Sequence, residues 1–222
     1  MRLSLALCVA VASITSIPAF ANPNVQPMFT MLTTPSNWTW QTFNTLANTT
    51  AKGGLKKDQN VANRFYLERA ITGYTNATIT AYGDKSAPNE VVFYSGGWRT
   101  TSDKGLLKLS DVVNTAELTQ VKSNCNFGKI EDKYTGKDTL GKAFKGVNYI
   151  ESQTIYKWSK GTAKPLYVVA MRGGGSMQTS VLNQGMNSTV IVVPNVKDLN
   201  GAIALHGWNK EKNGKKVTCK VG

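Results

Sequence analysis

The sequence predicts an α+β fold, with two short N-terminal helices followed by a mainly antiparallel β-sheet, or a sandwich or barrel-like arrangement, in the C-terminal part. The clearest apolar residues at helical spacing occur before residue 71, whereas alternating, β-branched segments dominate after residue 76. Helices that precede a run of strands are typical of α+β chains with antiparallel sheets. Hydrophobic residues make up 41% of the chain, which is enough for a buried core and too many for a disordered protein.

Residues 1–21 are predicted to be a secretory signal peptide. Arg2 precedes an apolar run over residues 3–14, and residues 19–21 form a small-x-small cleavage box. The apolar run is too short to cross about 30 Å of hydrocarbon. We therefore expect cleavage near Ala21 and a secreted or periplasmic mature protein. Residues 22–222 are expected to form a single domain, with a subdivision near 110–125 as the alternative.

Two helices are predicted after a proline-containing, irregular lead-in over residues 22–35. The first is capped by Ser36 and places apolar side chains at helical spacing, namely Trp40, Phe43, Leu46 and Ala47. The second is expected over residues 58–71, with Asp58 as the N-cap and Gly73 as the stop.

Strands are expected wherever β-branched residues alternate with polar ones or gather in short apolar runs. These segments are 78–82, 90–94, 147–150, 154–158, 166–171, 189–193, 202–208 and 216–221. Residues 110–122 fit either a short helix or a strand. The lysine-rich residues 128–146 are predicted to form a long exposed loop.

Two cysteines, Cys125 and Cys219, remain once the signal peptide is removed. In an exported chain they are predicted to form one disulfide, because the compartment is oxidising. A structural zinc site would need four ligands, and two cysteines with a single histidine do not supply them. No metal is therefore predicted.

His206 is the only histidine of the chain, so any histidine-based chemistry must use it. In a strand over 202–208, His206 and Trp208 share one face, while Ile203 and Leu205 face the core. This pair would suit a ligand groove, with the indole stacking on a flat ring and the imidazole donating a hydrogen bond or ligating haem iron. The alternative is a surface imidazole beside an aromatic ring that covers the sheet.

Two further residues are candidates for ligand contact. Arg172 precedes three glycines and a serine, whose amides could form an anion-binding nest, although a flexible turn explains the same residues. Trp98 follows a glycine near the end of a predicted strand, in a pattern similar to the one around Trp208.

The positive charge of the chain is large, with 26 Lys and Arg against 13 Asp and Glu and a formal net charge of +13. In the last predicted strand, lysines alternate with Val217, Cys219 and Val221, which gives a basic face. The lysines singled out for anion contact are Lys210, Lys216 and Lys220. Protection of an exposed sheet edge is the alternative explanation for them.

These observations favour a binding protein over an enzyme, because the sequence lacks a nucleophile elbow, a P-loop and a dinucleotide fingerprint. We predict an exported basic protein that recognises an anionic or aromatic-stacking ligand, such as a cell-envelope or host polysaccharide, a nucleic acid or an acidic protein. One alternative is a secreted hydrolase or enzymatic toxin that uses dispersed carboxylates, among them Glu68, Glu90, Glu131, Asp132 and Glu151. The other is a carrier of haem or another small ligand through His206.

Overall fold

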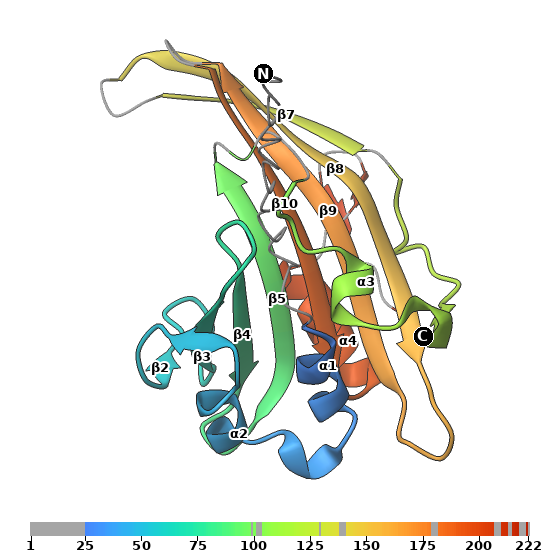
Figure 1. Cartoon of the computed structure of the whole chain (residues 1–222). Coiled ribbons are helices and arrows are strands. Elements are labelled where there is room, and N and C mark those ends of the chain that lie inside the picture. Colours follow the sequence, from blue (N-terminus) through green and yellow to red (C-terminus); the bar gives the residue numbers. More distant parts are fainter. Residues whose placement is uncertain are drawn as a thin grey trace, which may run out of the picture.

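The chain forms a twisted antiparallel sheet with helices on both faces (Figure 1). The computed structural model describes residues 25–98, 100, 104–128, 130–137, 141–178, 182–206, 210–212, 215–217 and 221. Within these residues the predicted α+β class with a mainly antiparallel sheet is confirmed. No helix among them is long and apolar enough to cross a membrane.

Among the described residues the main sheet has ten strands, and its central path runs β1-β3-β4-β5-β10-β9-β8-β6, with β2 paired to β3 and β7 paired to β8. The strands are β1 (Thr49–Ala51), β2 (Lys56–Lys57), β3 (Phe65–Ile71), β4 (Thr78–Gly83), β5 (Pro88–Trp98), β6 (Leu118–Gln120), β7 (Ile130–Lys137), β8 (Ala143–Trp158), β9 (Leu166–Gln178) and β10 (Leu182–Val193). A separate hairpin pairs β11 (Lys210–Lys212) with β12 (Lys215–Val217).

The helices are α1 (Gln26–Leu32), α2 (Trp40–Asn44), α3 (Leu109–Val112) and α4 (Val196–His206), with 3-10 turns η1 (Pro35–Asn37) and η2 (Thr115–Glu117). In Figure 1, α1 and α3 lie on one face of the sheet and α4 lies on the other. The strands β7 to β10 continue beyond the helices and project from the body of the molecule.

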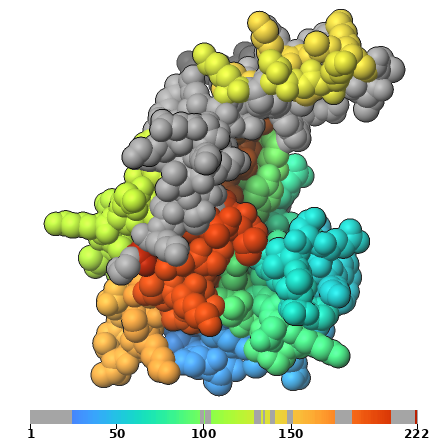
Figure 2. Space-filling model, turned by 180° about the vertical axis from the view of Figure 1, so that it is seen from behind, coloured from blue at the N-terminus to red at the C-terminus, as the bar shows by residue number. Residues whose placement is uncertain are grey.

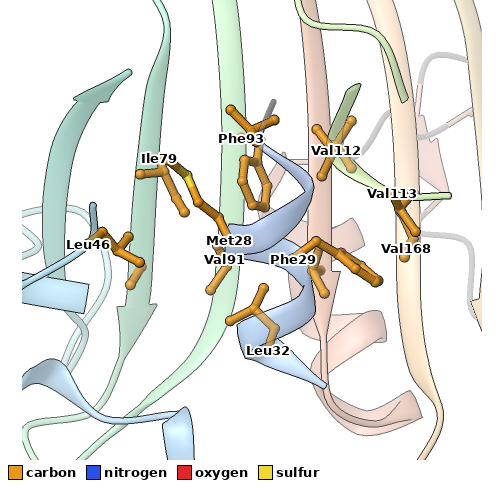
Figure 3. Packing of buried hydrophobic residues seen from close by; sticks show 14 of the residues in the cluster. Met28, Phe29, Leu32, Leu46, Ile79, Val91, Phe93, Val112, Val113 and Val168 are labelled. Atoms are coloured by element: carbon orange, nitrogen blue, oxygen red, sulfur yellow. The ribbon is translucent and has the colours of Figure 1, made fainter. Parts of the chain in front are cut away.

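Each face of the sheet carries its own apolar core, because the central strands are buried on both sides. In β10, Val190 and Val192 belong to the core under α1, whereas Ile191 and Val193 belong to the core under α4. Figure 3 shows the first core, in which Met28, Phe29 and Leu32 of α1 pack against strand residues that include Ile79, Val91 and Phe93. The second core contains Leu199, Ala202 and Ile203 of α4.

The predicted second helix is wrong, because residues 65–71 form β3. Leu67, Arg69 and Ile71 are buried in alternation along this strand, which is the period of a strand and not of a helix. The predicted first helix is confirmed only in part: it is shorter than expected, and Thr39 caps it in place of Ser36. The lead-in also contains α1, since Pro27 in a first helical turn loses no hydrogen bond.

The strand predicted at 202–208 is also wrong, because α4 extends to His206. The side chain of Asn195 accepts a hydrogen bond from the backbone N–H of Asp198 at 2.9 Å, which satisfies one free donor in the first turn. Buried residues then recur at helical spacing as Leu199, Ala202 and Ile203. Leu205, which a strand would have placed in the core, is 48% exposed.

The lysine-rich segment 128–146 is largely a β-hairpin and not a loop. Strand β7 pairs with the first half of β8, and the two strands predicted at 147–150 and 154–158 are both parts of β8, with a shift of register around Glu151. The ambiguous segment 110–122 contains both predicted structures, since α3 and η2 precede β6.

Candidate functional site

Four side chains form a row across neighbouring strands at one end of the sheet. Lys56 of β2 pairs with Tyr66 of β3, Tyr66 pairs with Tyr82 of β4, and Tyr82 pairs with Glu90 of β5. Directly paired residues point to the same face of a sheet, so the row lies on one surface. Tyr82 packs against the core under α4, which places the row on that face.

The two tyrosine rings form the centre of this row. Their ring centroids are 5.9 Å apart with an interplanar angle of 35°, and both residues are half-buried. The ammonium group of Lys56 lies 5.9 Å from the Tyr66 ring, within the range of a cation–π contact. The row therefore offers an aromatic surface with a positive charge at its outer end.

Arg64 lies above the inner end of the row, just before β3. Its guanidinium carbon is 3.9 Å from the centre of the Tyr82 ring, its Nη1 is 3.5 Å from Oδ2 of Asp58, and its Nη2 is 3.1 Å from Oε1 of Glu90. The backbone N–H of Asp58 donates to the carbonyl of Arg64, which closes the loop between β2 and β3. One guanidinium group thus links this loop, an aromatic ring and a buried carboxylate.

His206 joins the same cluster from the last residue of α4. Its Nε2 lies 2.8 Å from Oε1 of Glu90 and 2.9 Å from Nη2 of Arg64, and its ring centroid is 5.4 Å from that of Tyr82. Nε2 can donate to Glu90 when it is protonated, or accept from Arg64 when it is not. The histidine therefore connects α4 to the charged end of the row.

Burial controls the chemistry of the inner part of this cluster. Glu90 is only 5% exposed, so its carboxylate depends on Arg64 and His206 for polar contacts. Burial also raises the pKa of the Tyr82 hydroxyl, an effect that nearby Glu90 reinforces and Arg64 opposes. The Tyr82 hydroxyl therefore stays a neutral hydrogen-bonding group at physiological pH.

A pocket of about 540 Å³ opens over the outer part of the row, lined by residues 56–60 together with Tyr66 and Tyr82. We call it the tyrosine pocket. Figure 2 views the molecule from the side of α4, where this helix, in orange-red, lies beside the cyan segment that includes β2 and β3. The lining combines two phenol rings, two lysines, two amides and one carboxylate, which can stack on a flat ring and bind hydroxyl or anionic groups.

Of the predicted ligand residues whose side chains the structure describes, His206 lies in this cluster and Arg172 does not. Arg172 lies in β9, where its Nε is 2.6 Å from Oε2 of Glu151. The glycines that follow it continue β9, paired with β8 and β10, so the predicted turn or nest is wrong. A role of Arg172 in ligand contact stays a prediction.

The remaining predicted residues lie in parts of the chain with little or no described structure. Trp208, Lys220 and Cys219 lie outside the described residues, and only the strand positions of Trp98, Lys210 and Lys216 are described. Trp98 is the last residue of β5. Cys125 is fully buried and disulfide-bonded, and its pairing with Cys219 stays a prediction.

Sequence reasoning missed Arg64, Tyr66, Tyr82 and Asp58, and it treated Glu90 as an isolated acid. The available signal was the period-two pattern of residues 65–71, which would have made this segment a hairpin partner of residues 78–83. That pairing would have placed Tyr66 beside Tyr82.

The described residues contain no group of three or more His, Cys, Asp or Glu side chains that could hold a metal ion. Comparison with known protein families, curated proteins and solved structures finds no match to this chain.

Proposed function

We propose that the protein is an exported binding protein that holds an acidic polysaccharide in the tyrosine pocket. The observation that carries this proposal is the in-register row of Lys56, Tyr66 and Tyr82, over which the tyrosine pocket opens on the α4 face of the sheet. Export is part of the proposal and is supported by the signal-like residues 1–21, which predict a mature protein in the periplasm or outside the cell.

The chemistry of the pocket suits a sugar chain. Tyrosine rings offer an apolar face that a pyranose ring can cover, together with a hydroxyl at the edge. Gln59 and Asn60 supply amide donors and acceptors for sugar hydroxyls, and both side chains are exposed. Lys56 and Lys57 supply point charges for carboxylate or sulfate groups on the same chain.

A carboxylate in the pocket wall favours a saccharide over a nucleic acid. Asp58 pairs with Arg64 and accepts the N–H of Asn60, and the remaining lone pairs of its carboxylate can accept from sugar hydroxyls, which supply donors along the whole chain. The phosphates of a nucleic acid backbone supply acceptors only, whereas an acidic sugar chain carries hydroxyl donors beside its charged groups. Nucleic acid is therefore a control ligand in the experiment below.

The charge of the rest of the molecule supports attraction of a polyanion. In the β7–β8 hairpin, exposed Lys133, Lys137 and Lys145 occupy positions on one face, because Lys133 pairs with Val147, Thr135 with Lys145 and Lys137 with Ala143. Lysine-rich surfaces raise the rate of encounter with anions and make it sensitive to salt.

The two alternatives have weaker support. A hydrolase would need two carboxylates that reach a substrate, and Glu90 is buried in contact with Arg64 and His206. Haem ligation through Nε2 of His206 would require both of these neighbours to move away.

The proposal is tested by titrating the protein with polygalacturonate, neutral dextran and single-stranded DNA in an isothermal calorimeter at low and high salt. We expect polygalacturonate to bind more tightly than dextran and DNA, with affinity falling as salt rises. A nucleobase stacked on an aromatic side chain is worth about 1–3 kcal/mol, and by analogy loss of the Tyr66 ring in Tyr66→Ala should weaken sugar binding about tenfold, which Tyr66→Trp should restore.

Lysine variants distinguish binding in the tyrosine pocket from nonspecific attraction by the positive charge of the protein. Lys56→Ala should weaken binding, while Lys85→Ala, which removes an exposed lysine outside the pocket, should change it little. Equal loss in both lysine variants, with Tyr66→Ala unaffected, would show charge attraction alone and would overturn the proposed site.

A further inference from the structure

A second cavity of about 360 Å³ lies on the opposite face of the sheet, between α1, the segment from α3 to η2, and the end of β8. We call it the α1 cavity. Its volume lies in the range of about 300–1,000 Å³ that small-molecule sites occupy. Phe29, Val112, Val113 and Trp158 of its lining belong to the core under α1, which separates it from the tyrosine pocket.

The floor of the α1 cavity is apolar and aromatic. Phe29 and Trp158 are buried and contact each other edge to face, with ring centroids 5.8 Å apart and an interplanar angle of 75°. Val112 and Val113 complete the floor, and both are almost fully buried. These side chains are at most 3% exposed, so a ligand would meet only their edges, which favour contact with its apolar part.

Glu117 supplies the one carboxylate among the described residues that line this cavity. Its Oε2 accepts a hydrogen bond from Nε1 of Trp158 at 2.8 Å, and its Oε1 accepts one from the ammonium group of Lys160 at 2.7 Å. These bonds, that of Lys160 first, lower the pKa of Glu117. The carboxylate is therefore negatively charged at neutral pH and held in place by the indole.

The other polar side chains of the lining mostly form hydrogen bonds with nearby backbone groups. The hydroxyl groups of Thr30 and Thr33 donate to backbone carbonyls of α1, and the side chain of Asn114 accepts from the N–H of Ala116. The side chain of Gln26 donates to the carbonyl of Ser110. The strongest polar attraction for a ligand is thus the charge of Glu117.

We propose that the α1 cavity binds a small organic amine, whose ammonium group takes the place of the Lys160 ammonium at Glu117 and whose apolar part lies over Phe29 and Val113. The side chain of Lys160 is 69% exposed, so the protein loses little when this lysine returns to solvent. Lys160 therefore acts as a tethered competitor for the ligand. This site is independent of the tyrosine pocket.

The experiment is calorimetric titration of the full mature chain with 2-phenylethylamine at pH 7, with 2-phenylethanol and 3-phenylpropionate as matched neutral and anionic probes. We expect the amine to bind, the alcohol to bind at least tenfold more weakly and the carboxylate not to bind. A shift of the Trp158 indole N–H resonance during the amine titration would place the ligand at Glu117.

Variants of the charged pair make the proposal sharper. Lys160→Ala removes the competitor and should tighten amine binding about 1.5- to 5-fold, the range expected for an exposed ion pair. Lys164→Ala, which removes a nearby exposed lysine outside the lining, is the control and should leave binding unchanged. Glu117→Gln keeps an acceptor for Trp158 and should abolish the preference for the amine over the alcohol.

Three results would overturn the proposal. These are equal binding of the amine and the alcohol, no binding of the amine to the folded wild-type chain, and no gain in affinity for Lys160→Ala. The Lys160→Ala test looks for tighter amine binding. A folding defect would weaken binding, so it could not produce the expected result. Tyr66→Ala should leave amine binding intact, which separates this site from the proposed polysaccharide site.

Discussion

Nε2 of His206 lies 2.8 Å from Oε1 of Glu90, and this contact joins the last residue of α4 to the first half of β5. The same carboxylate oxygen is 3.1 Å from Nη2 of Arg64, which precedes β3. Three elements that are distant in the sequence therefore meet at one buried acid. Glu90 is the inner end of the row that continues through Tyr82 and Tyr66 to Lys56, so this contact fixes the end of the row opposite the tyrosine pocket.

Arg64→Met should destabilise the fold strongly. The substitution leaves Glu90, which is 5% exposed, without its guanidinium partner, and breaking a buried ion pair from one side typically costs about 3–5 kcal/mol. Urea unfolding at pH 7 measures the change. A loss of less than about 1 kcal/mol would contradict this view of the cluster.

A double-mutant cycle supplies the control for Arg64→Met. Glu90→Gln removes the charge that the arginine neutralises, so Arg64→Met should cost less in the Glu90→Gln background than in the wild type. Additive losses would show that Arg64 acts through its contacts with Tyr82 and Asp58 and not through Glu90.

The fold class could be predicted from sequence because it depends on local periodicity. Alternation over residues 78–82 and the apolar run over residues 90–94 identified β4 and β5. The secondary-structure predictions were wrong where the apolar residues of a short segment fit both the helical and the strand periodicity. Residues 202–208 alternate like a strand, but the helix begins earlier at Val196, and its cap Asn195 and buried Leu199 lie outside that window.

The site was less predictable than the fold because it depends on register and on long-range contacts. Tyr66, Tyr82 and Glu90 form a row only when β3, β4 and β5 pair in one particular register, and a shift of one residue would put them on opposite faces. His206 was identified because it is the only histidine, but its contacts with Arg64 and Glu90 require the tertiary fold.

Gly96→Ala should destabilise the sheet between β5 and β10. Gly96 has a φ of +106°, and a Cβ atom built on it would lie 2.2 Å from the backbone oxygen of Met186. Strain in this region costs about 1–3 kcal/mol before the clash is added. We expect a melting temperature several degrees lower, measured by circular dichroism.

Gly54→Ala is the matched control for Gly96→Ala. A Cβ atom at Gly54 has no neighbour within 4 Å, so the substitution should change the melting temperature little. Equal melting temperatures for the two variants would contradict the close approach of β5 and β10 at Gly96.

A disulfide between Cys125 and Cys219 should connect the interior to the C-terminal end of the chain. Cys125 is fully buried and disulfide-bonded, and nearby Val221 is held by two hydrogen bonds to the side chain of Asn200. A bridge that closes a loop of about 94 residues should stabilise the fold by roughly 4 kcal/mol. Peptide mapping without reductant should recover the linked pair, and a free thiol at Cys219 would contradict it.

Tyr74 should make the stability of the protein fall at alkaline pH. Burial, reinforced by the charge of Asp111, raises the pKa of Tyr74 from 10.0 to about 12. Between these values the unfolded chain releases the phenol proton while the folded chain retains it, so the stabilising contribution is full below pH 10 and is lost as pH rises towards 12. Absorbance at 295 nm should show a phenol that ionises near pH 12 in the folded protein and near pH 10 in urea. Burial also raises the pKa of Tyr82 and Tyr94, so Tyr74→Phe should reduce the amplitude of late ionisation by one phenol and reduce the fall in stability between pH 10 and 12. An unchanged amplitude in that variant would contradict the assignment to Tyr74.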